Sequence, residues 1–233
     1  MRAIHGNLQA VRERIARAAA AAGREPRSVT LLAVSKTHPA AMVERALEAG
    51  QRAFGENYVQ EAVEKMDALA GRDIAWHLIG PLQSNKTRLA AARFDWVHSI
   101  ESVKIARRLS GQRPAGMAPL NVLIQVNVSG EAGKSGVAPE EVSGLANAVS
   151  SMPNLRLRGL MAIPEPTGDA QLQRCRLSEL RKLLEQLRKQ HPGLDSLSMG
   201  MSDDMESAIA EGATLVRIGT AIFGNRQKIR PAA

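Results

Sequence analysis

The segment LLAVSKTHPA, residues 31–40, joins a short apolar run to a polar turn that contains one lysine. Leu31 to Val34 have the length and composition of a buried strand, and Pro39 favours a turn shortly after it. A strand that ends in Ser35, Lys36 and Thr37 carries an amine at its carboxyl end. The question is whether the rest of the chain supplies further strands that end in polar residues.

Apolar, strand-like runs recur along the 233 residues and alternate with helical stretches. Eight strands are expected, at 29–36, 52–54, 74–80, 96–100, 120–128, 155–163, 194–199 and 215–219. Eight alternating β and α units predict an α/β fold, a (β/α)8 TIM barrel. We expect a single domain over 1–233, with an N-terminal helix in 1–25 and the barrel in 29–224. An open doubly wound sheet is the alternative, but no G-x-G-x-x-G motif follows the first strand.

Composition limits the classes of partner that the chain can have. A single cysteine, Cys175, cannot form an internal disulfide, and neither a membrane-spanning run nor a secretory h-region is found. We therefore expect a cytoplasmic protein that does not bind membranes. The net charge is +8, but the basic residues are spread over helices among acids, and aromatics are only 3%. A chain without an aromatic stacking platform is not expected to bind nucleic acid.

Lys36 is a candidate nucleophile. A lysine amine that is desolvated inside a barrel loses its proton more readily and can then form an imine with an aldehyde. A lysine at a strand end that extends its ammonium group into solvent is the ordinary alternative. Because lysines are common, this residue alone does not decide between the two interpretations.

The ends of the last two strands add a predicted anion site. In TIM barrels the loops after strands seven and eight recurrently bind phosphate. Gly219 lets backbone N–H groups approach an anion, and Thr220 supplies a hydroxyl, while Ser202 follows the seventh strand. A lysine and a phosphate site together predict a ligand with an aldehyde and a phosphate. Pyridoxal 5′-phosphate (PLP) and the phosphosugar substrate of an imine-forming aldolase both meet that description.

Five motifs, AVSKTHP, FGENYVQE, WHLIGPLQSNK, LMAI and SMGMSDDMESAIAEGATLVRIGTAIFG, together resemble the pyridoxal phosphate homeostasis protein family of the YggS/PROSC type. The resemblance runs from about Val29 to Gly224. It implies the barrel of the alanine racemase N-terminal domain (PLP fold type III) without the racemase's second, β-rich domain. It also implies a protein that holds PLP as a Schiff base and acts in its intracellular storage, buffering or delivery to PLP-dependent apoenzymes, without robust catalytic turnover. A slow PLP-dependent racemase or lyase is the alternative.

The resemblance also assigns roles to individual residues. Lys36 would carry PLP covalently, Arg217 would face the pyridine nitrogen, and Ser202, Gly219 and Thr220 would contact the phosphate. Asn57, His77 and Met199 would line the cofactor. The resemblance implies no catalytic residue and no metal ligand.

Two residue types argue for binding rather than turnover. Arginine is a donor without an acceptor, so Arg217 would leave the ring nitrogen unprotonated and the ring a weaker electron sink. Racemases use a second base, a tyrosine of the domain that is missing here, whereas the one tyrosine of this chain is Tyr58. Since that missing domain is also the dimerising one, a monomer is expected.

Overall fold

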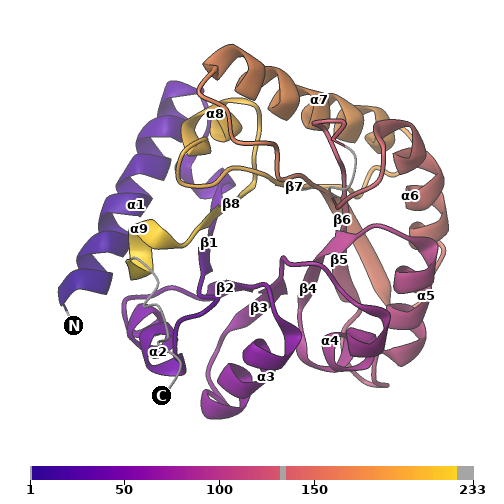
Figure 1. Ribbon diagram of the computed structural model, residues 1–233, viewed down its shortest axis with the longest axis horizontal. Coiled ribbons are helices and arrows are strands. Elements are labelled where there is room, and N and C mark those ends of the chain that lie inside the picture. Colours follow the sequence, from indigo (N-terminus) through magenta and orange to yellow (C-terminus); the bar gives the residue numbers. More distant parts are fainter. Residues whose placement is uncertain (1, 132–134, 225–233) are drawn as a thin grey trace, which may run out of the picture.

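Eight parallel strands close into a barrel, and helices surround it on the outside (Figure 1). The computed structural model describes residues 2–131 and 135–224. Residues 1, 132–134 and 225–233 of the expected domain lie outside the described residues. The strands pair in chain order, and β8 pairs with β1 to close the ring. The predicted TIM barrel is confirmed.

All eight expected strands are present, with ends that differ by a few residues. They are β1 (Thr30–Val34), β2 (Ala53–Glu56), β3 (Ala75–Leu78), β4 (Trp96–Ile100), β5 (Leu120–Gln125), β6 (Leu155–Met161), β7 (Ser196–Ser198) and β8 (Leu215–Ile218). The helices are α1 (Arg2–Ala21), α2 (Ala40–Glu48), α3 (Val59–Ala68), α4 (Thr87–Arg93), α5 (Val103–Gln112), α6 (Val142–Ser150), α7 (Ala170–Arg188), α8 (Met205–Ala210) and α9 (Thr220–Phe223). No helix in the described ranges combines the length and the apolar composition that crossing a bilayer requires.

Side-chain alternation along the strands divides the core into two layers. The larger cluster of buried residues lies between the strands and the helices, with Phe54, Leu78 and Leu120 among its members. Smaller clusters fill the inside of the barrel, one of them formed by Leu32, Val34 and Ile79. Lys36, two positions beyond Val34, therefore follows the inner face of β1 at the carboxyl end of the barrel.

Helix α1 fastens the last elements of the chain to the first. Its apolar stripe, which includes Leu8, Val11 and Ile15, is buried, and the helix lies along α8 and α9 (Figure 1). Asn7 donates a hydrogen bond to the carbonyl of Ile222 at 2.9 Å. Arg14 pairs with Glu206 at 2.8 Å. The helix therefore supports the loops that follow β7 and β8.

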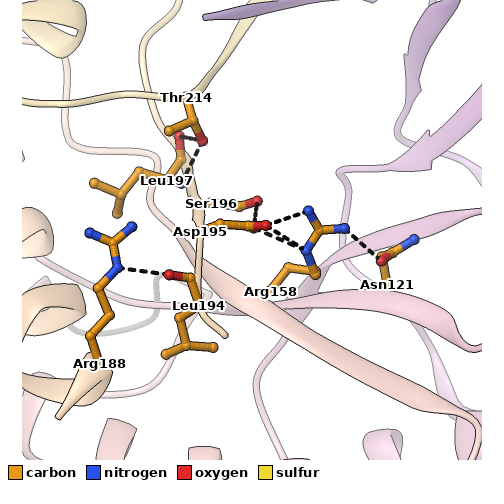
Figure 2. A network of polar contacts seen from close by, with 8 residues as sticks. All are labelled: Asn121, Arg158, Arg188, Leu194, Asp195, Ser196, Leu197 and Thr214. Carbon is orange, nitrogen blue, oxygen red and sulfur yellow. Dashed lines mark hydrogen bonds and ion pairs between the residues drawn. The ribbon is translucent and has the colours of Figure 1, made fainter. Parts of the chain in front are cut away.

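A polar network centred on Arg158, in the middle of β6, joins the amino-terminal ends of β5 and β7 (Figure 2). Arg158 binds Asp195 at 2.6 Å and Asn121 at 3.0 Å, and its guanidinium lies 4.8 Å from the centre of the Trp96 ring. Partial burial would raise the pKa of Asp195, but hydrogen bonds from Arg158 and Ser196 outweigh it and hold that pKa below its ordinary value. Because β7 has only three residues, its backbone hydrogen bonds are few, and these side-chain contacts further fix it to β6.

A bulge in β6 directs Arg158 into this network. The β5–β6 register passes from Leu157 directly to Gly159, which leaves Arg158 without a partner on β5. Gly159 has a φ of 153°, and a Cβ there would lie 1.9 Å from the carbonyl oxygen of Ser196. Glycine is required at this position both for its backbone angle and for the close approach of β7.

We predict that Gly159→Ala lowers the free energy of unfolding by about 2–4 kcal/mol, since it combines a strained φ with a steric clash. Gly144→Ala is the matched control. It lies in α6, where an added Cβ meets open space, and should raise stability by about 0.5–1 kcal/mol. Urea denaturation of both variants measures the two effects. Equal effects at the two glycines would contradict this account of the bulge.

Candidate functional site

A cavity of about 190 Å³ opens at the carboxyl ends of the strands. Six of the eight predicted site residues line it: Lys36, Asn57, Ser202, Arg217, Gly219 and Thr220. Val34, Ile79 and Ile163 supply apolar walls, and His38 and Met201 complete the lining. A larger hollow of about 380 Å³ lies at the opposite end, between α1 and the first strands, where TIM barrels carry stability rather than chemistry.

Strand alternation places Lys36 at this cavity. It stands two residues beyond the inward-facing Val34, and its side chain is half-buried. The turn that carries it has an unusual backbone, because Thr37 has a φ of 66°. His38 follows, buried and 5.2 Å from the ring centre of Phe223 in α9. The lysine thus sits on a compact, well-packed turn between β1 and α2.

Arg217 occupies the inner face of β8 with its guanidinium fixed by backbone and side-chain oxygens. It donates hydrogen bonds to the carbonyl of Ser198 at 2.6 Å, to the Ser198 hydroxyl at 2.8 Å and to the carbonyl of Ala162 at 2.8 Å. Burial lowers the pKa of Arg217 to about 10, which is partly offset by Asp204, and leaves it charged at neutral pH. These three bonds leave other N–H donors of the guanidinium for the cavity.

Gly219 brings the end of β8 against the end of β1. A Cβ at this position would lie 3.1 Å from the carbonyl oxygen of Val34, so the close backbone approach favours glycine. Helix α9 begins at the next residue, Thr220, and its first turn has backbone N–H groups without partners inside the helix. The cavity therefore has hydroxyl and backbone donors at the end of β8.

Asn57 contributes an unsatisfied acceptor. Its Oδ1 atom is buried, and no described residue hydrogen-bonds to it. Gly80 makes room for this segment, since a Cβ there would lie 2.4 Å from the Asn57 carbonyl oxygen. A buried amide oxygen without a partner is costly, and its place in the cavity wall fits a bound ligand that carries a hydrogen-bond donor.

His77 does not line the cavity but belongs to a buried chain of hydrogen bonds that reaches Arg217. Its Nδ1 lies 2.9 Å from His98 Nε2, and His98 Nδ1 lies 2.9 Å from the Ser198 hydroxyl that accepts from Arg217. Burial lowers the pKa of His77 to about 3. Burial, followed by the charges of His77 and Arg217, lowers the pKa of His98 well below its ordinary value. Both imidazoles are neutral, so His98 donates through one of its ring nitrogens and accepts through the other.

Met199 also lies away from the cavity, and Met201 takes a place in its wall. Ser198 faces inward, so Met199 points outward and is fully buried between the strands and the helices. Gly200, with a φ of 95°, then redirects the chain. The Asp204 carboxylate accepts a hydrogen bond from the Met201 N–H at 2.5 Å, and Arg14 donates to the Ser202 carbonyl at 3.3 Å.

Besides the apolar wall of Val34, Ile79 and Ile163, four residues of the site were not among the sequence predictions: His38, His98, Ser198 and Met201. Two of them had a usable signal. Alternation from Trp96 and Ser196 places His98 and Ser198 inside the barrel, next to the predicted His77 and Arg217. For His38 and Met201 the pattern carries no signal, because both lie in turns whose direction depends on the left-handed residues Thr37 and Gly200.

Comparison with known proteins agrees with the geometry. The family model of the alanine racemase N-terminal domain matches residues 6–227. The pyridoxal phosphate homeostasis protein of Pseudomonas aeruginosa is 60% identical over 233 residues, which is 100% of both chains. That of Escherichia coli (strain K12) is 53% identical over 97% of this chain and 98% of its own.

Solved structures give the same relationship. PipY of Synechococcus elongatus with PLP bound has a TM-score of 0.81 and 38% identity, over 95% of this chain and 100% of PipY. The same protein without PLP has a TM-score of 0.84 and 39% identity over the same shares. Alanine racemase of Corynebacterium glutamicum, at 20% identity and a TM-score of 0.66, shares the fold over 99% of this chain and 63% of its own.

The closed barrel, its cavity and the matching family model place the chain in the class built on the alanine racemase N-terminal domain. Within that class, the chain belongs to the pyridoxal phosphate homeostasis protein family.

The buried histidines predict a stability that falls with acid. His77 and His98 stay neutral in the native state to a pH far below the ordinary histidine value, whereas in the unfolded chain they bind protons near pH 6.5. Unfolding therefore takes up protons below pH 6.5. As the pH falls from 8 to 5, each histidine should lower the free energy of unfolding by about 2 kcal/mol.

His98→Gln tests this, with urea denaturation at both pH values. At pH 8 the variant is less stable because it repacks the hydrogen-bond chain. At pH 5 the deficit relative to the wild type should shrink by about 2 kcal/mol, because the variant lacks one of the two linked protons. A deficit of the same size at both pH values would refute the neutral assignment of His98.

Proposed function

We propose that this protein binds PLP as a Schiff base on Lys36 and acts in PLP homeostasis by storing the cofactor, buffering it or delivering it to PLP-dependent apoenzymes, without robust turnover. The observation that carries the proposal is the meeting of Lys36, Arg217, Gly219 and Thr220 around one cavity. The PLP-bound structure of PipY and the name shared by the curated relatives support it.

The donor set fits the cofactor. PLP supplies an aldehyde, which condenses with an amine and releases one water, together with a phosphate and a pyridine ring. The Lys36 amine would take the aldehyde end. The hydroxyls of Ser202 and Thr220 and the backbone beside Gly219 would hold the phosphate, since hydroxyls and helix N–H groups are good phosphate donors. The unsatisfied oxygen of Asn57 would accept from a donor of the ligand.

Arg217 favours holding the cofactor over turning it over. Its guanidinium is fixed by Ser198 and Ala162, stays charged at neutral pH, and can donate but not accept. Placed beside the ring nitrogen, it would keep that nitrogen unprotonated and so leave the ring a poor electron sink. Tyr58 is 57% exposed and does not line the cavity. It is therefore a poor candidate for a proton donor on the opposite face of the ligand.

Lys36→Ala should abolish covalent attachment. Wild-type protein incubated with PLP and reduced with borohydride is expected to carry one fixed cofactor per chain, on the peptide that contains Lys36. The variant should carry none and keep only weak binding through the phosphate contacts. Lys182→Ala, which removes an exposed lysine of α7, should label like the wild type. Mass spectrometry of intact and digested protein reads the result, and fixation elsewhere in the wild type would reject the assignment.

A site that holds PLP without turnover should catalyse little exchange of an amino acid's α-hydrogen. In deuterium oxide, the PLP-loaded protein should exchange the α-hydrogen of alanine or serine no faster than the same concentration of free PLP. Proton NMR of the amino acid measures the rate. Exchange well above free PLP that disappears in Lys36→Ala would instead support the slow racemase or lyase.

A further inference from the structure

A buried ionic cluster lies directly behind the turn that carries Lys36. Lys65 of α3 donates hydrogen bonds to Glu56 at 2.6 Å, to Glu61 at 2.7 Å and to the carbonyl of Ser35 at 2.7 Å. All three N–H donors of its ammonium group are therefore used. The side chains of Lys65 and Glu56 are 5% and 0% exposed, and that of Glu61 is 27% exposed.

The cluster binds the chain on both sides of Lys36. On the preceding side, Ser35 gives its carbonyl to Lys65 and donates its hydroxyl to Glu56 at 2.6 Å. On the following side, the backbone N–H of Thr37 donates to Glu61 at 2.5 Å. Because Ser35 faces outward, the alternation of the backbone turns Lys36 inward to the cavity. The cluster thus fixes the two residues that determine where the lysine points.

Thr37 shows why such a restraint is needed. Its φ of 66° lies in the left-handed region, which is unfavourable for a β-branched residue and persists only where the surroundings enforce it. The bond from its N–H to the Glu61 carboxylate is charge-assisted and therefore stronger than a bond between neutral groups. Thr37, which is both strained and held by Glu61, directly follows Lys36, the proposed nucleophile.

Stability alone does not account for the cluster. A buried ion pair recovers little more than the cost of removing its charges from water. Here, burial raises the pKa of Glu56 against the opposing effect of Lys65, and the Oε2 atom of Glu56 is left without a partner among the described residues. An arrangement with that cost is better explained by the geometry that it imposes on the turn.

We propose that Lys65, Glu56 and Glu61 form a positioning clamp that holds the Ser35–Thr37 turn in its strained conformation and directs the Lys36 amine at the ligand's aldehyde. This inference rests on the proposed function, because it assigns the clamp to the covalent part of ligand binding. The proposed phosphate contacts, Ser202, Gly219 and Thr220, lie in the loop after β7 and where β8 passes into α9, in a different part of the barrel from the clamp.

Two ligands separate the covalent part of binding from the rest. PLP carries the aldehyde, whereas pyridoxine 5′-phosphate has the same ring and phosphate with an alcohol in its place and cannot form the Schiff base. Glu61→Ala removes the anchor of Thr37, and Glu61→Gln keeps a neutral acceptor there. Glu64→Ala, an exposed position on the same helix, is the matched control. Fluorescence titration gives the Kd of each ligand for each protein.

Glu61→Ala should weaken PLP binding about tenfold, the size expected for a lost charge-assisted hydrogen bond, while the Kd for pyridoxine 5′-phosphate stays within about twofold of the wild type. The Kd of Glu61→Gln for PLP should lie between those of the wild type and Glu61→Ala. The Kd of Glu64→Ala should match that of the wild type. Without ligand, the Thr37 amide should exchange with deuterium about tenfold faster in Glu61→Ala than in the wild type, because the variant lacks the hydrogen bond from this amide to Glu61.

Equal weakening of both ligands, or no weakening of either, would overturn the clamp. The first result would indicate general loosening of the fold, and the second would mean that Glu61 does not position the lysine. If the wild type formed no Schiff base at all, the proposed function would fail. The amide exchange of Thr37 would then still test the clamp by itself.

Discussion

The pairing of β8 with β1 is the contact on which the site depends. Residues 30–33 align with residues 215–218 in register, and this ladder joins the first strand of the barrel to the last. Gly219 extends the contact, since its backbone lies against the Val34 carbonyl. Without this closure the lysine turn and the end of β8 would not share a cavity. Helix α1 reinforces the same junction from outside by its bonds to α8, α9 and their loops.

Much of the fold could be predicted because each strand carries a local signal. Even β2 and β7, the runs with few apolar residues, occur where alternation requires them. The strand ends were less predictable, because hydrogen bonding rather than composition ends a strand. The run 120–128 keeps apolar residues as far as Val128, yet β5 ends at Gln125, and the described chain just beyond it makes an isolated bridge from Val126 to Val137.

The candidate site was predictable where a residue lies at the end of a strand. Lys36, Asn57, Arg217 and Gly219 gather at the cavity for that reason, while their ligand contacts stay predictions. Met199 lies elsewhere because one step along a strand reverses the direction of the side chain. The cluster around Lys65 could not be found from the sequence. It depends on how α3 packs against β1 and β2, and no spacing in the chain links Lys65 to Ser35.

The hydrogen-bonded histidines give the barrel interior a polar side beside its apolar one. Leu32, Val34 and Ile79 pack as apolar residues, while His98 and Ser198 connect toward Arg217. The guanidinium is thus held by the interior of the barrel rather than by surface groups. Its direction is set by Ser198 of β7 and by Ala162, which follows β6.

The cavity straddles the seam between the first strand and the last, and this has a consequence for biosynthesis. Because β1 is translated before β8 and α9, a growing chain has the amine before it has the opposite wall. A molecule that binds both walls links β1 to β8, and only a closed barrel can retain it. Occupancy of the cavity would then mark a barrel in which β1 and β8 have paired.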